Sequence, residues 1–207
     1  ALARALSARA RCVAIKPVES GCTPDRRGAE DGELLALATG QREPHQALQR
    51  LVTPVAPPVA ADIEGVDLDP DRWLERVRAH AARAEITLVE AAGGLLSPLT
   101  WHLDGLELAS RLGARVLIVS ANRLGVLNHT RLTLEVLAMH GLEVVGVILN
   151  DADEDADDVS RARNAQALRR LCPELAVHEM PHLGGWTEAL AHIPDALLDA
   201  ILGEELL

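Results

Sequence analysis

The stretch RCVAIKPV, residues 11–18, decides the fold class because it is a short run rich in apolar and β-branched residues. Such a run is typical of a strand buried on both faces of a parallel sheet. Similar runs follow at 86–91, 115–121, 142–150 and 175–180, and helical patterns occupy about 71–83, 103–112, 128–140, 157–171 and 190–203. This alternation predicts a doubly wound α/β fold, in which helices cover both faces of a mostly parallel sheet, as one domain over residues 1–207.

The composition restricts the partners of the protein. A net charge of -11 argues against duplex nucleic acid, because phosphates are bound by clustered lysine and arginine side chains. Small anions stay possible, since free backbone N–H groups bind them. The 3 cysteines are few and widely spaced, which indicates a reducing, cytoplasmic location without a disulfide framework. No apolar run approaches membrane-spanning length, so no membrane partner is expected.

Two segments lie outside this alternation. The first residues, ALARALSARARC, have the composition of a transit peptide, but they lead directly into the first strand. The alternative is the end of a helix that begins before residue 1. The proline-rich stretch TPVAPPVAAD, residues 53–62, predicts an ordered loop.

Each predicted strand ends in, or is followed by, polar residues or glycines. The stretches are KPVESG (16–21), EAAGG (90–94), ANRLGVLNH (121–129), ND (150–151) and MPHL (180–183). In doubly wound sheets, ligands bind at the carboxyl ends of the strands. These stretches are therefore the candidates for a functional site.

Together with EDGELLAL and PVAPPVAAD, these stretches resemble the dethiobiotin synthetase family of P-loop NTPases, in order and along nearly the whole chain. The resemblance implies an ATP-dependent carbon–nitrogen ligase of biotin biosynthesis that uses Mg²⁺. Its reaction closes the ureido ring of dethiobiotin from 7,8-diaminononanoate (7,8-diaminopelargonate) and CO₂. The path passes through a carbamate and a carbamic–phosphoric anhydride, and the enzyme is implied to be a homodimer.

One family motif, the P-loop GxxxxGK[ST], does not occur within residues 1–207. The family order places it just upstream of residue 1, so that ALARALSARA ends the helix that it opens. We therefore expect the first strand and the P-loop to be missing from an N-terminally truncated chain. Two alternatives to the enzyme are a non-catalytic homodimeric relative that binds a small carboxylate and another P-loop amide-forming ligase.

Lys16 is the only lysine in the chain, because every other member of the 20 lysines and arginines is an arginine. The resemblance makes Lys16 catalytic, between a carbamate oxygen and a γ-phosphate oxygen. A compact ammonium on a flexible stem suits that place better than the planar fork of arginine. The alternative is a solvated surface charge. The resemblance also places Ser20 at the carbamate end of the substrate, where an ordinary turn serine is the alternative.

Asp31 and Glu90 are the predicted Mg²⁺ ligands. Glu90 ends a strand in the manner of a Walker-B acid, where a hard cation takes oxygen ligands beside the phosphates. The alternative for Glu90 is a surface acid. Asp31 has Glu30 and Glu33 as competitors, and EDGE also suits a plain helix N-terminus.

The resemblance assigns nucleotide binding to several strand ends. Asn150 is expected to read adenine through its amide donor and acceptor, and a loop asparagine is the alternative. Pro181, His182 and Leu183 are expected to flank the base. Glu188 matches a ribose-binding acid only loosely, with a surface acid as the alternative. The other assigned residues are Asp31, Glu90, Ala91, Ala92, Gly93 and Asp151, and Ala91 stands where the family usually has glycine.

RLGVLNHT, residues 123–130, joins a strand to a helix. Its N–H groups at Gly125, Val126 and Leu127 are expected to be free and to form an anion site. By resemblance the anion is the substrate carboxylate, bound across a dimer interface with help from Asn128. The alternative for Asn128 is a helix cap.

Two further patterns have metal-like spacing. DADEDADD, residues 151–158, spaces acids like a calcium loop, but Ala156 and Ala162 replace the turn glycine and the last acid. HEMPH, residues 178–182, has helical zinc spacing, yet its proline and strand context are incompatible with a helix. Neither pattern predicts a metal site.

Overall fold

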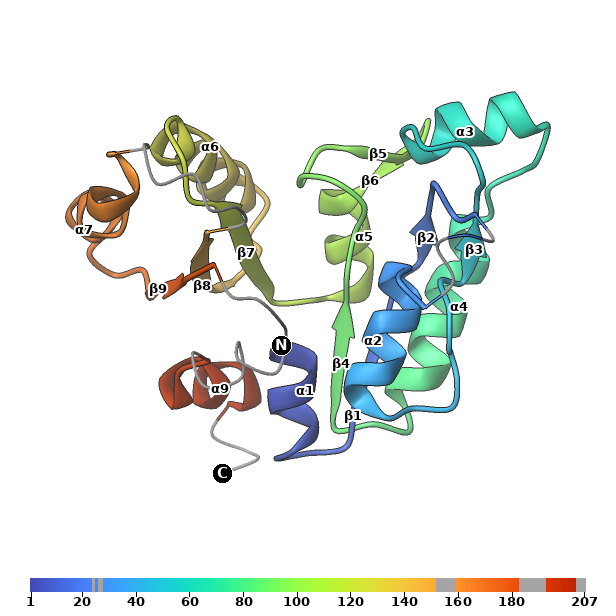
Figure 1. The fold of residues 1–207 in the computed structure, drawn as a ribbon, viewed down its shortest axis with the longest axis horizontal. Coiled ribbons are helices and arrows are strands. Elements are labelled where there is room, and N and C mark those ends of the chain that lie inside the picture. Colours follow the sequence, from blue (N-terminus) through green and yellow to red (C-terminus); the bar gives the residue numbers. More distant parts are fainter. Residues whose placement is uncertain (24, 26–27, 152–158, 183–192, 204–207) are drawn as a thin grey trace. The chain divides into compact units, whose positions relative to one another are not determined.

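The structure, a computed structural model, describes residues 1–23, 25, 28–151, 159–182 and 193–203 (Figure 1). It contains two compact units, Leu2–Leu112 and Gly113–Leu207, the latter together with Ala1, and each is described by itself. Both units combine strands with helices, and the strand pairs are parallel except for β5 with β6. The predicted α/β class is therefore confirmed, whereas the single domain stays a prediction. None of the helices in the described ranges is long and apolar enough to cross a membrane.

The unit Leu2–Leu112 is built around the parallel pair β1 and β4. Its elements are α1 (Leu2–Ser7), β1 (Cys12–Ile15), β2 (Val18–Glu19), α2 (Asp31–Thr39), β3 (Gln49–Arg50), α3 (Pro57–Glu64), α4 (Pro70–Ala81), β4 (Ile86–Val89), β5 (Pro98–Thr100), β6 (Leu103–Asp104) and α5 (Gly105–Leu112). Cys12 pairs with Ile86 and Ile15 with Val89, so β1 and β4 end side by side. Helices α1, α2 and α4 contact β1.

A side chain satisfies the edge of β1 that faces away from β4. Gln41 Oε1 accepts the Ala14 N–H at 2.8 Å, and Gln41 Nε2 donates to the Ala14 carbonyl at 2.9 Å. The amide therefore makes the two hydrogen bonds that a neighbouring strand would make. Since an open strand edge is a site for unwanted pairing, Gln41 also protects this edge.

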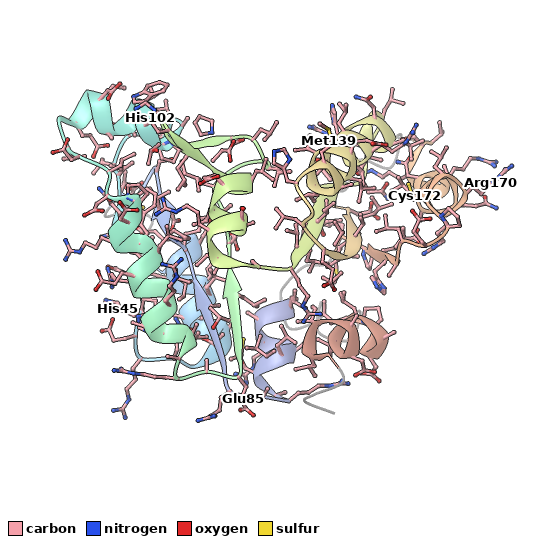
Figure 2. The ribbon with its side chains drawn as sticks, turned by 180° about the vertical axis from the view of Figure 1, so that it is seen from behind. His45, Glu85, His102, Met139, Arg170 and Cys172 are labelled. Atoms are coloured by element: carbon pink, nitrogen blue, oxygen red, sulfur yellow. The ribbon has the colours of Figure 1, made fainter. Side chains whose placement is uncertain are left out.

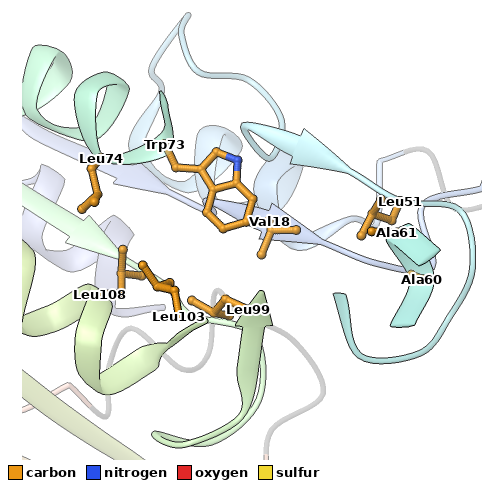
Figure 3. Packing of buried hydrophobic residues seen from close by; sticks show 9 residues of the cluster. All are labelled: Val18, Leu51, Ala60, Ala61, Trp73, Leu74, Leu99, Leu103 and Leu108. Atoms are coloured by element: carbon orange, nitrogen blue, oxygen red, sulfur yellow. The ribbon is translucent and has the colours of Figure 1, made fainter. Parts of the chain in front are cut away.

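The core of this unit surrounds Trp73, which is 2% exposed (Figure 3). The other buried members of the cluster are Val18, Leu51, Ala60, Ala61, Leu74, Leu99, Leu103 and Leu108. Trp73 also donates from Nε1 to Gln49 Oε1 at 2.9 Å, so its one polar atom is satisfied. Because the chain has no Phe or Tyr, the remaining core volume is filled by aliphatic side chains.

The prediction of a loop over 53–62 is wrong from Pro57 onward, where α3 begins. Pro57 and Pro58 occupy the first turn, where the N–H that proline lacks has no helical partner and its fixed φ is already helical. Gly65, at φ 64°, ends the helix in the left-handed conformation. The proline-rich composition thus marks a helix start.

The unit Gly113–Leu207 has the parallel strand order β7-β8-β9. Its elements are β7 (Val116–Ala121), α6 (Val126–Met139), β8 (Val144–Asn150), α7 (Arg161–Leu171), β9 (Val177–Met180) and α9 (Asp195–Leu202). The consecutive residues Val147, Ile148 and Leu149 of β8 are all buried. Because side chains alternate along a strand, both faces of this sheet are covered, as predicted for a doubly wound fold.

We expect Trp73→Ala to lower the free energy of unfolding by about 3 to 5 kcal/mol, because it leaves a cavity in the aliphatic core. Trp101, which is 59% exposed and donates to Asp62, provides the matched control. Trp101→Ala should cost about 1 kcal/mol or less. Urea unfolding of both variants and the parent measures the difference. Equal losses in the two variants would show that Trp73 is not the centre of the core.

Candidate active site

The side chains of Lys16, Asp31 and Glu90 converge at the carboxyl end of the β1 and β4 pair. Lys16 Nζ lies 2.7 Å from Glu90 Oε1 and 2.8 Å from Asp31 Oδ2. It also donates to the carbonyl oxygen of Ala91 at 3.2 Å. The structure therefore brings together the three residues to which the sequence assigned catalysis and metal binding.

Strand register explains why Lys16 and Glu90 meet. Ile15 pairs with Val89, and the Glu90 N–H donates to the Ile15 carbonyl at 2.9 Å. Lys16 and Glu90 are thus the first residues after two strands that end at the same level. Asp31 reaches them as the first residue of α2, a helix in contact with β1.

The three groups differ in exposure. Lys16 is 5% exposed, whereas the side chains of Asp31 and Glu90 are 45% and 49% exposed. Burial alone would lower the pKa of Lys16, but the charges of Glu90 and Asp31 and their hydrogen bonds outweigh it and raise this pKa. The carboxylate partners therefore favour the charged ammonium form of Lys16, and they also face solvent.

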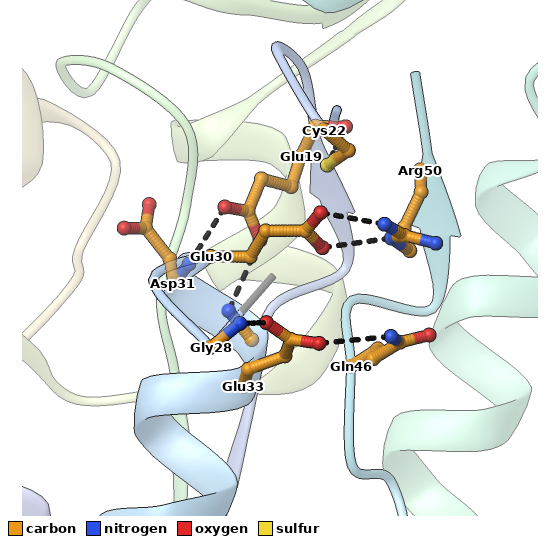
Figure 4. A network of polar contacts seen from close by, with 9 residues as sticks. Glu19, Cys22, Gly28, Glu30, Asp31, Glu33, Gln46 and Arg50 are labelled. Atoms are coloured by element: carbon orange, nitrogen blue, oxygen red, sulfur yellow. Dashed lines mark hydrogen bonds and ion pairs between the residues drawn. The ribbon is translucent and has the colours of Figure 1, made fainter. Parts of the chain in front are cut away.

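A buried glutamate fixes the position of Asp31 (Figure 4). Glu19, 4% exposed, accepts the Asp31 N–H at 2.6 Å and the Gly32 N–H at 3.0 Å. Its carboxylate thereby satisfies two free N–H groups at the positive end of α2, while Glu30 at the N-cap position makes no side-chain cap. The sequence analysis missed this role of Glu19, because the cap comes from β2 and not from the residues that begin the helix.

The competing acids of EDGE have other partners. Glu30 is fully buried and binds Arg50 through two hydrogen bonds, at 2.8 Å from Nε and 2.5 Å from Nη2. Glu33 accepts from the Gly28 N–H at 2.5 Å and from Gln46 at 3.0 Å. Of these three acids, only Asp31 contacts Lys16. Asp31 as a Mg²⁺ ligand stays a prediction.

Glu19, Cys22 and Glu30 form the one group of three potential metal ligands in the described part of the chain, with ligand atoms within 4.8 Å of one another. Both carboxylates are already used, by α2 and by Arg50. Burial, followed by the charges of Glu19 and Glu30, raises the pKa of Cys22 to about 11, so the thiol stays protonated. The contacts of Glu19, Cys22 and Glu30 are therefore those of side chains that stabilise the fold.

The residues after Glu90 form a tight turn. Gly93 has φ 81°, and a Cβ there would lie 2.6 Å from Ser97 Oγ. Ser97 Oγ accepts the Gly94 N–H at 2.9 Å and closes the turn. Ala91 and Ala92 lie between Glu90 and this turn, and Ser20, partly exposed, follows β2.

The predicted anion site lies at the start of α6. Gly125 has φ 94° at the N-cap position. Val126 corrects the prediction of three free N–H groups, because its N–H donates to the Arg123 carbonyl at 3.1 Å and closes a turn. Asn128 is exposed within the helix and does not cap it. A groove of about 370 Å³ opens beside it and is lined by Leu127, Asn128, Arg131, Leu132, Glu135 and Leu171.

The predicted base-reading residues lie at the carboxyl end of the β7-β8-β9 sheet. Asn150 ends β8 in register with Met180 of β9, and the Asp151 N–H donates to the Met180 carbonyl at 2.8 Å. Pro181 and the exposed His182 follow directly. Leu183 and Glu188 lie outside the described residues, as do residues 152–158 of the acidic pattern. Val177–Met180 is a strand, as expected from the proline in HEMPH.

Two buried asparagines beside this strand end escaped the sequence analysis. Asn122 Nδ2 donates to Asp151 Oδ1 at 2.9 Å, and Asn164 Nδ2 donates to Asn122 Oδ1 at 2.9 Å. Each asparagine is 5% exposed. The only sign of this pair in the sequence was Asn122 within the stretch ANRLGVLNH. That stretch does not show that the partner of Asn122 is Asn164 of α7.

The family described as an AAA domain matches residues 1–196 of the chain. A protein of Anaeromyxobacter dehalogenans named ATP-dependent dethiobiotin synthetase BioD is 41% identical over 161 residues, which cover 77% of this chain and 71% of that protein. A protein of the same name from Anaeromyxobacter sp. is 37% identical over 196 residues, covering 94% and 84%. Another, from Phenylobacterium zucineum, is 36% identical over 187 residues, covering 86% and 79%. The chain therefore belongs to the dethiobiotin synthetase family.

Proposed function

We propose that this protein is an ATP-dependent dethiobiotin synthetase, which closes the ureido ring from 7,8-diaminononanoate and CO₂ in biotin biosynthesis. The observation that supports this most directly is the buried ammonium of Lys16 between Glu90 and Asp31. The reaction is that of the relatives named ATP-dependent dethiobiotin synthetase BioD.

Asp31 and Glu90 fit a Mg²⁺ ion by their chemistry. Both offer carboxylate oxygens, the ligand type that this hard cation prefers. One oxygen of each carboxylate lies within 2.8 Å of the Lys16 ammonium nitrogen, and both side chains are about half exposed, so each carboxylate also faces solvent. When bound, the ion would neutralise the charge on the ATP phosphates.

Lys16 is the proposed catalytic group for transfer of the γ-phosphoryl group to the substrate carbamate. Its ammonium stabilises the negative charge that builds up between the carbamate oxygen and the γ-phosphate oxygens. Burial strengthens this attraction, because little water screens it. Ser20, directly after β2, is proposed to hydrogen-bond the carbamate end. The neighbouring amine then displaces phosphate and closes the ring.

Nucleotide and substrate recognition involve further residues. We assign adenine to Asn150, with Asp151, Pro181, His182, Leu183 and Glu188 around the nucleotide, and the phosphates to the Ala91, Ala92 and Gly93 turn. The substrate carboxylate is assigned to the start of α6, at Gly125, Val126, Leu127 and Asn128. Because the Val126 N–H is used internally, Gly125 and Leu127 are the remaining N–H donors there. Arg131 lines the groove beside Asn128 and adds a positive charge for a carboxylate.

A homodimer is proposed on the exposed apolar side chains around α6. Leu132 is 57% exposed, Met139 81% and Leu124 82%. Leu132 and Met139 are seven residues apart and so share one face of the helix. A second copy of the chain would bury this face and place the α6 start at the interface.

Two coarser assignments complete the proposal. The cytoplasm is the proposed location, because the cysteines in the described residues are free thiols. One domain over 1–207 is proposed because a single family match spans residues of both compact units.

We expect Lys16→Arg to lower turnover by at least about 10²-fold, because a misplaced transition-state charge contact costs roughly 2.7 to 4 kcal/mol. ADP release is measured with saturating ATP, Mg²⁺, bicarbonate and diaminononanoate, on the chain with any coding sequence that precedes Ala1. A thermal melt checks folding.

The matched control is Arg170→Lys. Arg170 is exposed and extends from α7 away from the ribbon (Figure 2), so its exchange should leave turnover and stability unchanged. If Lys16→Arg turned over as fast as the parent, Lys16 would not have the proposed catalytic role and would contribute only its positive charge. Carboxylate binding without ADP release by the parent would favour the non-catalytic relative.

Sedimentation at micromolar concentration should give about twice the monomer mass for the parent and the monomer mass for Leu132→Glu, since a buried unpaired carboxylate opposes association. Leu37→Glu is the control, because Leu37 of α2 is also exposed, at 63%, but lies away from α6 in the sequence and in the other unit. Dissociation by both variants, or by neither, would contradict an α6 interface.

A further inference from the structure

A buried relay of two asparagine side chains ends on Asp151. Asn164, in the first turn of α7, donates to Asn122 Oδ1 at 2.9 Å and contacts Ser160 Oγ at 3.3 Å. Asn122 in turn donates to Asp151 Oδ1 at 2.9 Å and, more weakly, to the Arg161 carbonyl at 3.4 Å. Each asparagine is 5% exposed, so the relay is shielded from water.

The direction of this relay is fixed by its last member. An ionised carboxylate only accepts hydrogen bonds, so Asn122 must turn its NH₂ group toward Asp151 and its oxygen toward Asn164. Both hydrogens and the oxygen of the Asn122 amide are then used. The backbone adds a further restraint, because the Asn122 N–H donates to the Asn150 carbonyl at 2.8 Å. Asn122 therefore restrains both residues of the ND pair.

Asn150 and Asp151 offer different chemistry to a purine. The Asn150 amide combines a donor with an acceptor, which matches the N6 donor and N7 acceptor of adenine. A carboxylate that is free to turn accepts from two adjacent donors, the arrangement that N1–H and the N2 amino group of guanine present. Among the described residues the Asn150 amide has no hydrogen-bond partner, whereas one Asp151 oxygen is held by Asn122.

We propose that Asn122, supported by Asn164, is a specificity-determining positioning residue that holds the Asp151 carboxylate away from the base, so that Asn150 selects adenine over guanine. The inference depends on the proposed use of ATP and names the residues behind its base preference. Neither Asn122 nor Asn164 is proposed to touch the nucleotide.

The test compares ATP with GTP in the parent and in Asn122→Ala. Turnover and nucleotide dissociation constants are both measured, and a thermal melt checks folding. In Asn122→Ala, the preference for ATP over GTP, measured by turnover and by dissociation constants, should fall by at least about tenfold. A change of this size corresponds to the discrimination that one bidentate contact with a base provides. Asn164→Ala, which leaves Asn122 in place but loosens it, should shift the preference in the same direction by less.

A double variant separates base selection from general loosening. In the double variant Asn122→Ala with Asp151→Ala, the improvement in turnover and binding with GTP should disappear. The reason is that the Asp151 carboxylate, which Asn122→Ala alone would release, is no longer present. Thr130→Val is the matched stability control. Thr130 is 1% exposed, and its Oγ1 lies 3.2 Å from Ser120 Oγ, which is not a member of the relay, so Thr130→Val should leave the preference unchanged.

Equal weakening of ATP and GTP in Asn122→Ala would overturn the inference, as would a gain with GTP that persists without Asp151. A parent that neither binds nor uses ATP would overturn the proposed function itself, and this inference with it. The parental measurement therefore distinguishes the two failures.

Discussion

The buried ammonium of Lys16 is the contact on which the rest of the site depends. It joins the ends of two strands to the first residue of a helix, through Glu90, Asp31 and the Ala91 carbonyl. An unpaired buried ion costs several kcal/mol, so Lys16 requires these partners as much as they are oriented by it. The Lys16 nitrogen thus links the carboxyl ends of β1 and β4 to the start of α2.

The acids around Lys16 have separate tasks although they are close in sequence. Glu19 satisfies the start of α2, Glu30 neutralises Arg50, and Glu33 closes the Gly28 turn. These contacts leave Asp31 as the acid that faces the ammonium. The local chemistry thus depends on which acid is already bound elsewhere, and not on the net charge of -11.

The sequence predicted those features that depend on local pattern. The five apolar runs became β1, β4, β7, β8 and β9, and Lys16 with Glu90 could be paired because parallel strands end at one edge. Partners from distant segments could not be predicted, as with Glu19 beneath α2 or Asn164 beside Asn122. The helix α3 was missed because proline was taken as a loop signal, although proline also suits a first helical turn.

The same backbone device fixes polar residues in both units. Glu90, Asn122 and Asp151 each stand directly after a strand, and each donates its N–H to the last residue of the neighbouring strand. The ladder thus extends one residue beyond the apolar run and restrains the backbone of the polar residue that follows it. Because the ladder does not restrain side chains, each of these residues needs a second contact. For Glu90 it is Lys16, and for Asp151 it is Asn122. A polar residue after a buried strand is therefore a site candidate whose function depends on that second contact, and the partner comes from an element that the strand pattern does not reveal.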